Sequence, residues 1–253
     1  MTDLSLRPRS ATELVDAAFQ VFRRDPAQFM LAAALVYVPW LLVRLTLEPS
    51  IVGGRPEPGR VIIGAAMSVF VYAIASGVIT LLAQDVYFDR QPDLPAAFRI
   101  VGRTMAPLLF VSLIIFVYLI AGAVLLLLPM FYVLARFFAV RQVVVIENAG
   151  VNQALSRSSE LTVGAKGHVL GTLLLAGALT LAVSFGAGLL MSIIPSVVVA
   201  FVVAAVLSVI IYPFLAITET LLYYDMRIRK EGFDVEYLAR GGPPADSISG
   251  SAA

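Results

Sequence analysis

The sequence predicts an all-α membrane protein in which six transmembrane helices pair into three hairpins, each preceded by a short amphipathic interfacial helix. Two observations carry this prediction. Of the 253 residues, 60% are hydrophobic and only 14% are charged, whereas soluble domains are typically about 25% charged. The charged residues also leave uncharged intervals long enough for helices to cross a bilayer, which takes about 20 apolar residues each. The mean hydropathy of +0.92 fits burial in lipid rather than in a soluble core.

Six spans follow from these intervals. Residues 61–84 are uncharged and long enough for one crossing, and no charged residue occurs between Lys166 and Glu219. The latter stretch is too long for one crossing, and Pro195 marks its turn. The predicted spans are 29–47, 61–84, 106–127, 130–147, 169–192 and 197–224.

A short amphipathic stretch precedes each hairpin. These stretches are ATELVDAAFQVFRRDPAQF at 11–29, DLPAAFRIVGRTMAPLLF at 93–110 and GVNQALSRSSELTVGAKGHVLG at 150–171. Apolar residues at spacings of three and four give each stretch one face that can lie at the headgroup boundary. The sequence therefore predicts an interfacial helix followed by two spans, three times over. The alternative is that the three stretches are ordinary soluble loops.

The distribution of lysine and arginine predicts the orientation, because cytoplasmic loops carry the excess of these residues. With the N-terminus inside, the outer loops hold only Arg55 and Arg60. The inner segments then hold Arg7, Arg9, Arg23, Arg24, Arg90, Arg99, Arg103, Arg157, Lys166, Arg227, Arg229, Lys230 and Arg240. We therefore expect both termini in the cytoplasm of a cell with a bacterial inner membrane. Residues 1–240 are expected to form one domain, and residues 241–253, rich in Gly, Pro and Ser, a disordered cytoplasmic tail.

Three ionisable residues fall inside the predicted spans: Arg136, Arg141 and Glu219. A charge at mid-bilayer costs at least about 2.5–3.5 kcal/mol on insertion scales. At the helical rise of about 1.5 Å per residue, Arg141 and Glu219 each lie about 9 Å from the next charged residue toward the cytoplasm. We expect these two to pair, with Arg136 reaching toward the same carboxylate. This cluster is interpreted either as a structural ion pair or as a polar pocket open to the cytoplasm.

The composition argues against catalysis and against nucleic-acid binding. Cysteine is absent, His168 is the only histidine, and the net charge is +1. No H-E-x-x-H or G-x-S-x-G motif occurs, and no glycine-rich phosphate loop precedes a helix. We therefore expect no enzyme activity, no metal and no cofactor. His168 is interpreted as a polar anchor at the membrane interface.

The densest block of charge is LLYYDMRIRKEGFD at 221–234, directly after the sixth span. Its tyrosines and basic residues are typical of an interfacial anchor, and Gly232 is suited to end the helix. Anchoring does not explain the acids. We expect Asp225 and Glu231 to pair with the basic stretch around Arg157 or Arg103. This candidate cytoplasmic clasp comprises Asp225, Arg227, Arg229, Glu231 and Arg157.

Three stretches resemble a known family. They are LRPRSATELVDAAFQVFRRD at 6–25, VVVIENAGVNQALSRSSELTVGAKGHVLG at 143–171, and the block at 221–234. Together they resemble the glycerophosphoryl diester phosphodiesterase membrane domain and related six-span bacterial proteins, over nearly the whole chain to about residue 240. In the phosphodiesterases this module accompanies a catalytic barrel of the TIM type, which takes about 250 residues. The resemblance thus implies a stand-alone membrane module without the catalytic barrel.

Three functions remain open from the sequence. The first is a non-catalytic membrane-organising or accessory module, whose partners are the bilayer, anionic headgroups on the cytoplasmic side, and a protein that the sequence does not name. The second is a small transporter for an amphiphile or lipid-related solute, which predicts a water-lined cavity that reaches mid-depth near Arg136 and Glu219. The third is a membrane-embedded lipid hydrolase, which predicts paired acids or a nucleophile and base at a cleft.

Overall fold

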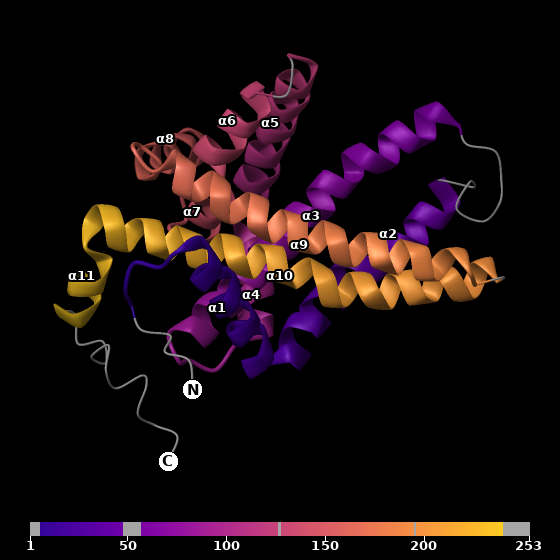
Figure 1. Ribbon diagram of the computed structural model, residues 1–253, viewed down its shortest axis with the longest axis horizontal. Helices are drawn as coiled ribbons and strands as arrows, with labels where there is room; N and C mark the ends of the chain where they lie inside the picture. Colours follow the sequence, from indigo (N-terminus) through magenta and orange to yellow (C-terminus); the bar gives the residue numbers. More distant parts are fainter. Residues whose placement is uncertain (1–5, 48–56, 126–127, 195, 240–253) are drawn as a thin grey trace.

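The computed structural model describes residues 6–47, 57–125, 128–194 and 196–239, and every regular element within these ranges is a helix (Figure 1). The helices are α1 (Ala11–Arg24), α2 (Pro26–Leu47), α3 (Pro58–Tyr87), α4 (Leu94–Arg103), α5 (Met105–Val124), α6 (Leu128–Phe137), α7 (Val140–Ile146), α8 (Val151–Leu161), α9 (Lys166–Ser192), α10 (Val197–Glu231) and α11 (Phe233–Ala239). The predicted all-α class is confirmed.

Six segments of the described chain are long and apolar enough to cross a membrane: Pro26–Leu47, Pro58–Tyr87, Met105–Val124, Leu128–Ile146, Lys166–Leu190 and Val206–Glu231. They correspond in order to the six predicted spans. The largest difference is at the last one, because α10 continues through the charged block to Glu231, where Gly232 ends it in a left-handed conformation (φ 63°). The predicted turn at Pro195, residues 126–127 of the third predicted span and the predicted tail at 241–253 lie outside the described residues.

Short helices precede each hairpin, as the amphipathic patterns predicted: α1 before α2, α4 before α5, and α8 before α9. The Ser10 side chain caps the start of α1, and Glu13 completes the capping box by accepting from the Ser10 amide. These hydrogen bonds, together with one from Arg7, lower the pKa of Glu13 to about 2. Two long segments separate each of these short helices from the next, and the chain returns to the same side after the second one. The helices α1, α4, α8 and α11 therefore all lie at one end of the hairpins.

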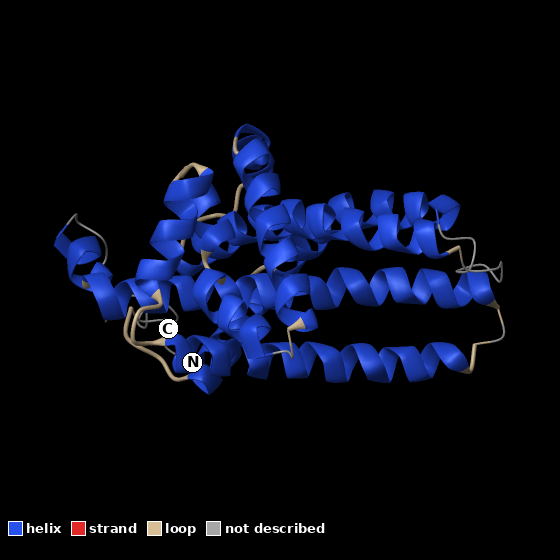
Figure 2. Cartoon of the chain, turned by 90° about the horizontal axis from the view of Figure 1, so that it is seen from above, coloured by secondary structure: helices blue, strands red, loops and turns tan. Residues whose placement is uncertain are grey.

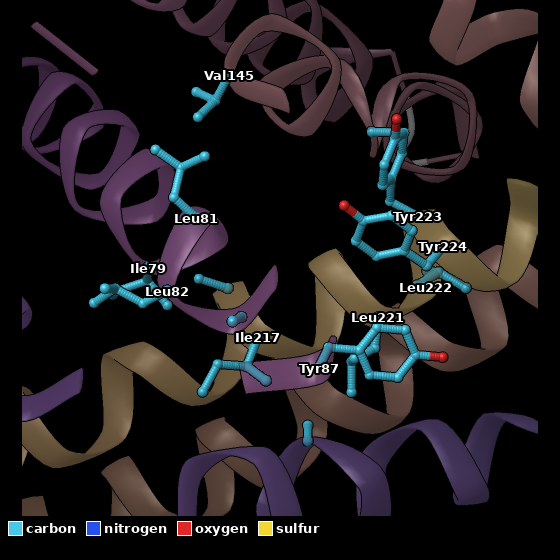
Figure 3. Packing of buried hydrophobic residues seen from close by; sticks show 14 of the residues in the cluster. Ile79, Leu81, Leu82, Tyr87, Val145, Ile217, Leu221, Leu222, Tyr223 and Tyr224 are labelled. Atoms are coloured by element: carbon cyan, nitrogen blue, oxygen red, sulfur yellow. The ribbon is translucent and has the colours of Figure 1, made fainter. Parts of the chain in front are cut away.

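The centre of the protein is the contact between α3 and α10. In Figure 3, Ile79 and Leu82 from α3 lie opposite Ile217 and Leu221 from α10. Tyr224 of α10 stacks on a tyrosine of α3, and its side chain is only 1% exposed. Tyr223 is also buried. The two tyrosines of the charged block are therefore core residues that pack against other helices.

The α5–α6 hairpin takes a different direction from the other long helices. In Figure 1 it projects away from α2, α3, α9 and α10, which run along the long axis and lie side by side in Figure 2. The two helices approach each other closely at Gly122, where an added Cβ would lie 2.6 Å from the amide nitrogen of Met130. Because α5 and α6 diverge from their neighbours, the base of the hairpin is hollowed on both sides.

Candidate functional site

A buried ion pair lies at the base of the α5–α6 hairpin. Nη2 of Arg141, on α7, donates to both carboxylate oxygens of Glu219, on α10, at 2.9 and 2.8 Å. The two side chains are only 14% and 9% exposed. Nε2 of Gln142 donates to the same carboxylate at 3.3 Å. The structure thus brings together Arg141 and Glu219, which the depth estimate predicted to lie at the same level.

A break in the fourth span positions Arg141. The span is not one straight helix, because Ser158 of α8 inserts its hydroxyl between α6 and α7. This hydroxyl accepts from the amide of Ala139 at 3.3 Å and donates to the carbonyl of Arg136 at 3.0 Å. A side chain that enters the hydrogen-bond ladder in this way kinks a helix. The break starts α7 at Val140 and directs the next residue, Arg141, toward α10.

Arg136 does not join the pair, and the expectation that it reaches Glu219 is wrong. Its Nη1 donates instead to the hydroxyl of Tyr132, one turn back on α6, at 3.2 Å. The physical reason is the break at 138–139, which places Arg136 and Arg141 in separate helices.

Several polar atoms around the pair are buried and have no hydrogen-bond partner within the described part of the chain. They include Nε of Arg141 and Oε1 of Gln142. The Tyr72 ring lies under the Arg141 guanidinium, with 4.9 Å between the guanidinium carbon and the ring centroid. Buried polar atoms are nearly always satisfied in folded proteins, so each exception calls for an explanation. Here the two unpaired atoms belong to neighbouring residues of α7.

Two cavities meet at the ion pair. One has a volume of about 400 Å³ and extends along α3 and α5 past Tyr72, Ser68 and Phe116. The other, of about 170 Å³, lies between α6 and α9. The two share Arg141, Glu219 and four apolar residues: Ile115, Leu119, Leu134 and Leu215. The larger volume falls within the range of small-molecule sites, about 300–1,000 Å³. The walls are largely apolar, and the charged pair lines both cavities.

A second polar centre lies at the end of the hairpins where the short helices gather. The Asp225 carboxylate, 2% exposed, accepts from the Arg9 amide at 2.7 Å and from Nε of Arg229 at 2.7 Å. Its other contact is Nε2 of His168 at 3.0 Å. The predicted partners of Asp225, Arg157 and Arg103, are wrong. The side chain is turned toward α9 and the N-terminal segment, because α10 packs against α1 and α9 at this level.

The remainder of the predicted clasp is present. Nη2 of Arg157 donates to Glu231 at 2.9 Å, and Nε of Arg227 donates to the same carboxylate at 3.1 Å. Arg157 also contacts Glu147, which accepts from the hydroxyl of Tyr223 at 2.7 Å. Hydrogen bonding to Glu231 raises the pKa of Arg157, so this cation stays charged. The network joins α8 to α10 and the end of α7.

The His168–Asp225 contact resembles the oriented base of a hydrolase, but it lacks the other parts. In the described ranges no serine, threonine or lysine side chain hydrogen-bonds to the His168 ring; Thr172 donates to its backbone carbonyl. Nor does any group of three His, Asp or Glu residues gather there as metal ligands would. The Asp225 carboxylate is already bound by the Arg9 amide and Arg229, which is the arrangement of a structural contact.

Comparison with protein-family models, with curated proteins and with solved structures finds no match for this chain. The interpretation of the site therefore rests on its geometry.

The sequence did not single out Tyr72, Gln142 or Arg9 as site residues. Gln142 could have been found from its place beside Arg141 in an apolar run. Tyr72 and Arg9 carry no comparable signal, because their roles depend on the packing of distant helices.

Proposed function

We propose that this protein is a non-catalytic integral membrane protein that binds a lipid-like amphiphile in the cavities beside the α5–α6 hairpin. One observation carries the proposal. Two largely apolar cavities converge on the Arg141–Glu219 pair, and polar atoms of Arg141 and Gln142 there have no partner among the described residues. Apolar walls suit a hydrocarbon chain, and unpaired donors and acceptors suit a polar group attached to it.

The charge of the pair restricts the chemistry of that polar group. Arg141 and Glu219 neutralise each other, so a ligand charge placed against them would remain unbalanced in a medium of low dielectric constant. The available atoms include a donor, Nε of Arg141, and an acceptor, Oε1 of Gln142. The part of the ligand that meets the pair is therefore uncharged and hydrogen-bonding, such as a hydroxyl, ester or amide.

The proposal places the protein in a bacterial inner membrane with both chain ends in the cytoplasm. The distribution of basic residues supports this orientation, since cytoplasmic segments carry the excess of Lys and Arg. It also includes a relationship to the glycerophosphoryl diester phosphodiesterase membrane-domain family, which the resemblance of the stretches at 6–25, 143–171 and 221–234 supports.

The cavities are largely apolar, not water-lined as the transporter prediction required, and Arg136 lines neither of them. Their apolar walls favour binding of an amphiphile over a purely organising module, which needs no such cavity beside the ion pair. Binding in this place is the first step of a carrier, and it is also sufficient for an accessory protein that senses or presents a lipid. The proposal includes no reaction, because the described residues near His168 lack a nucleophile hydrogen-bonded to its ring.

The proposal is tested by filling the cavity. Leu134 lines both cavities, so Leu134→Trp should occupy them. Leu128 lies on the same helix with 77% of its side chain exposed, and Leu128→Trp is the matched control. After purification in a mild detergent, mass spectrometry should find an amphiphile bound to the wild type and to Leu128→Trp, and a loss from Leu134→Trp. Equal retention by both variants would contradict the proposal.

A further inference from the structure

A third polar cluster joins α6 to the start of α9 and consists of Tyr132, Arg136 and Lys166. The hydroxyl of Tyr132 accepts from Nη1 of Arg136 at 3.2 Å and from Nζ of Lys166 at 3.3 Å. Lys166 also lies over the Tyr132 ring, with 4.4 Å between Nζ and the centroid. Because the tyrosine oxygen accepts from both cations, its own proton remains available for donation to a third group.

The cluster has an excess of positive charge. Among the described residues, neither Arg136 nor Lys166 forms an ion pair with a carboxylate, whereas Arg141, Arg157 and Arg229 all do. In addition, Nε of Arg136 is buried and has no hydrogen-bond partner there. Two cations held together by a neutral tyrosine repel each other, and an anion between them would remove that repulsion. The cluster thus has the charge and the donors of an anion site.

Chain neighbours of the cluster line the smaller cavity. Leu170, one turn after Lys166 on α9, lines that cavity, and so do Val133 and Phe137, which flank Arg136 on α6. Lys166 is also the first residue of the fifth span. Basic residues at the ends of spans are typical of the headgroup level. The amino end of α9 adds a partial positive charge at the same level.

We propose that Tyr132, Arg136 and Lys166 bind the phosphate of an anionic lipid whose hydrocarbon chain enters the cavity between α6 and α9. The guanidinium group supplies directed donors, the ammonium group a compact charge and the tyrosine a neutral donor, a combination that suits the several oxygens of a phosphate. The inference rests on the proposed function, because it assigns the headgroup of the amphiphile bound there. The uncharged part of the same lipid then faces Arg141 and Glu219.

The test compares two lipids that differ only in the phosphate: palmitoyl lysophosphatidic acid and palmitoyl monoacylglycerol. Binding to the purified wild type in detergent is measured by titration. We expect the phosphate lipid to bind about 30-fold more tightly, the effect of two cations on a membrane-surface anion. Arg136→Gln with Lys166→Gln should reduce its affinity to that of the neutral lipid, and Tyr132→Phe should weaken it about tenfold.

The matched control changes two exposed arginines of α4, Arg99→Gln with Arg103→Gln, which alters the total charge equally and should keep the preference. Thermal unfolding of each variant shows whether it is folded. The headgroup site is overturned if the double variant Arg136→Gln with Lys166→Gln still prefers the phosphate lipid. It is also overturned if the control variant loses that preference to the same extent. In that case neutral-lipid binding still supports the cavity function. If neither lipid binds to the wild type, the cavity function fails as well. If inorganic phosphate binds as tightly as the phosphate lipid, the site recognises free phosphate, and the proposal of a lipid headgroup is overturned.

Discussion

Replacing Glu219 with glutamine should destabilise the protein far more than the loss of one hydrogen bond, because the Arg141 guanidinium would remain charged and buried. The pair is 9–14% exposed, and both carboxylate oxygens lie within 2.9 Å of Nη2. Removing one member of a buried ion pair costs about 3–5 kcal/mol. With roughly 2–4 °C of melting temperature per kcal/mol for a chain of this size, we expect a loss of roughly 6–20 °C.

The assay is thermal unfolding in detergent, followed by the fluorescence of Trp40, the single tryptophan, which is 9% exposed on α2. The matched control is Glu57→Gln. Glu57 pairs with Arg60 at 2.8 Å, but both side chains are about half exposed. An exposed pair of this kind contributes at most about 1 kcal/mol. The contrast between the two glutamine variants therefore isolates the effect of burial from the effect of the contact itself.

A charge reversal then tests the pairing directly. Arg141→Glu alone and Glu219→Arg alone each leave like charges facing each other, whereas the two together restore an ion pair with the partners exchanged. We expect the double variant to be more stable than either single variant. The reasoning is refuted if the double variant is no more stable than the single ones, or if Glu219→Gln unfolds at the same temperature as Glu57→Gln.

Three further predictions concern other polar contacts of the protein. Asp225→Asn leaves Arg229 without its ion pair and weakens the contact with the Arg9 amide. Because Arg229 is 34% exposed, we expect the free energy of unfolding to fall by about 2 kcal/mol, less than the full cost of breaking a buried pair. Hydrogen exchange at the Arg9 amide should become faster, and unchanged exchange would be evidence against the contact. Ser158→Ala removes the hydroxyl between α6 and α7 and should cost about 1–3 kcal/mol, whereas Ser159→Ala, one residue further along an exposed face, should change the melting temperature little. The pKa of Glu13 is lowered from 4.5 to about 2, so the stabilising effect of its carboxylate is present above pH 4.5 and disappears as the pH falls toward 2. The difference in melting temperature between the wild type and Glu13→Gln should shrink over that interval. A difference that stays constant would contradict the capping role.

The spans and the ion pair could be predicted from the sequence because they depend on local quantities. An uncharged interval of sufficient length is visible in one dimension, and so is the depth of Arg141 and Glu219 relative to the ends of their spans. Both estimates need only the rise of a helix and the width of a bilayer. For this reason the order of the six spans and the matched level of the pair agree with the structure.

The break between α6 and α7 could not be predicted in this way. The residues at 137–140 include no proline and no glycine, so nothing local marks a kink. The cause is Ser158, which follows the break by about twenty residues and reaches it only when α8 has folded back. The wrong assignment of Arg136 follows from this omission. The partners of Asp225 were missed for a similar reason, since Arg9 is 216 residues away.

That separation between Arg9 and Asp225 has a consequence for the assembly of the protein in its membrane. Helices are synthesised in chain order, so α1 exists long before α10 supplies its carboxylate. Until then, neither the Arg9 amide nor the His168 ring can make its contact with Asp225. The attachment of the first helix to the last is therefore among the final events of biogenesis. A chain that stops before Asp225 would lack this closure between its first and last helices.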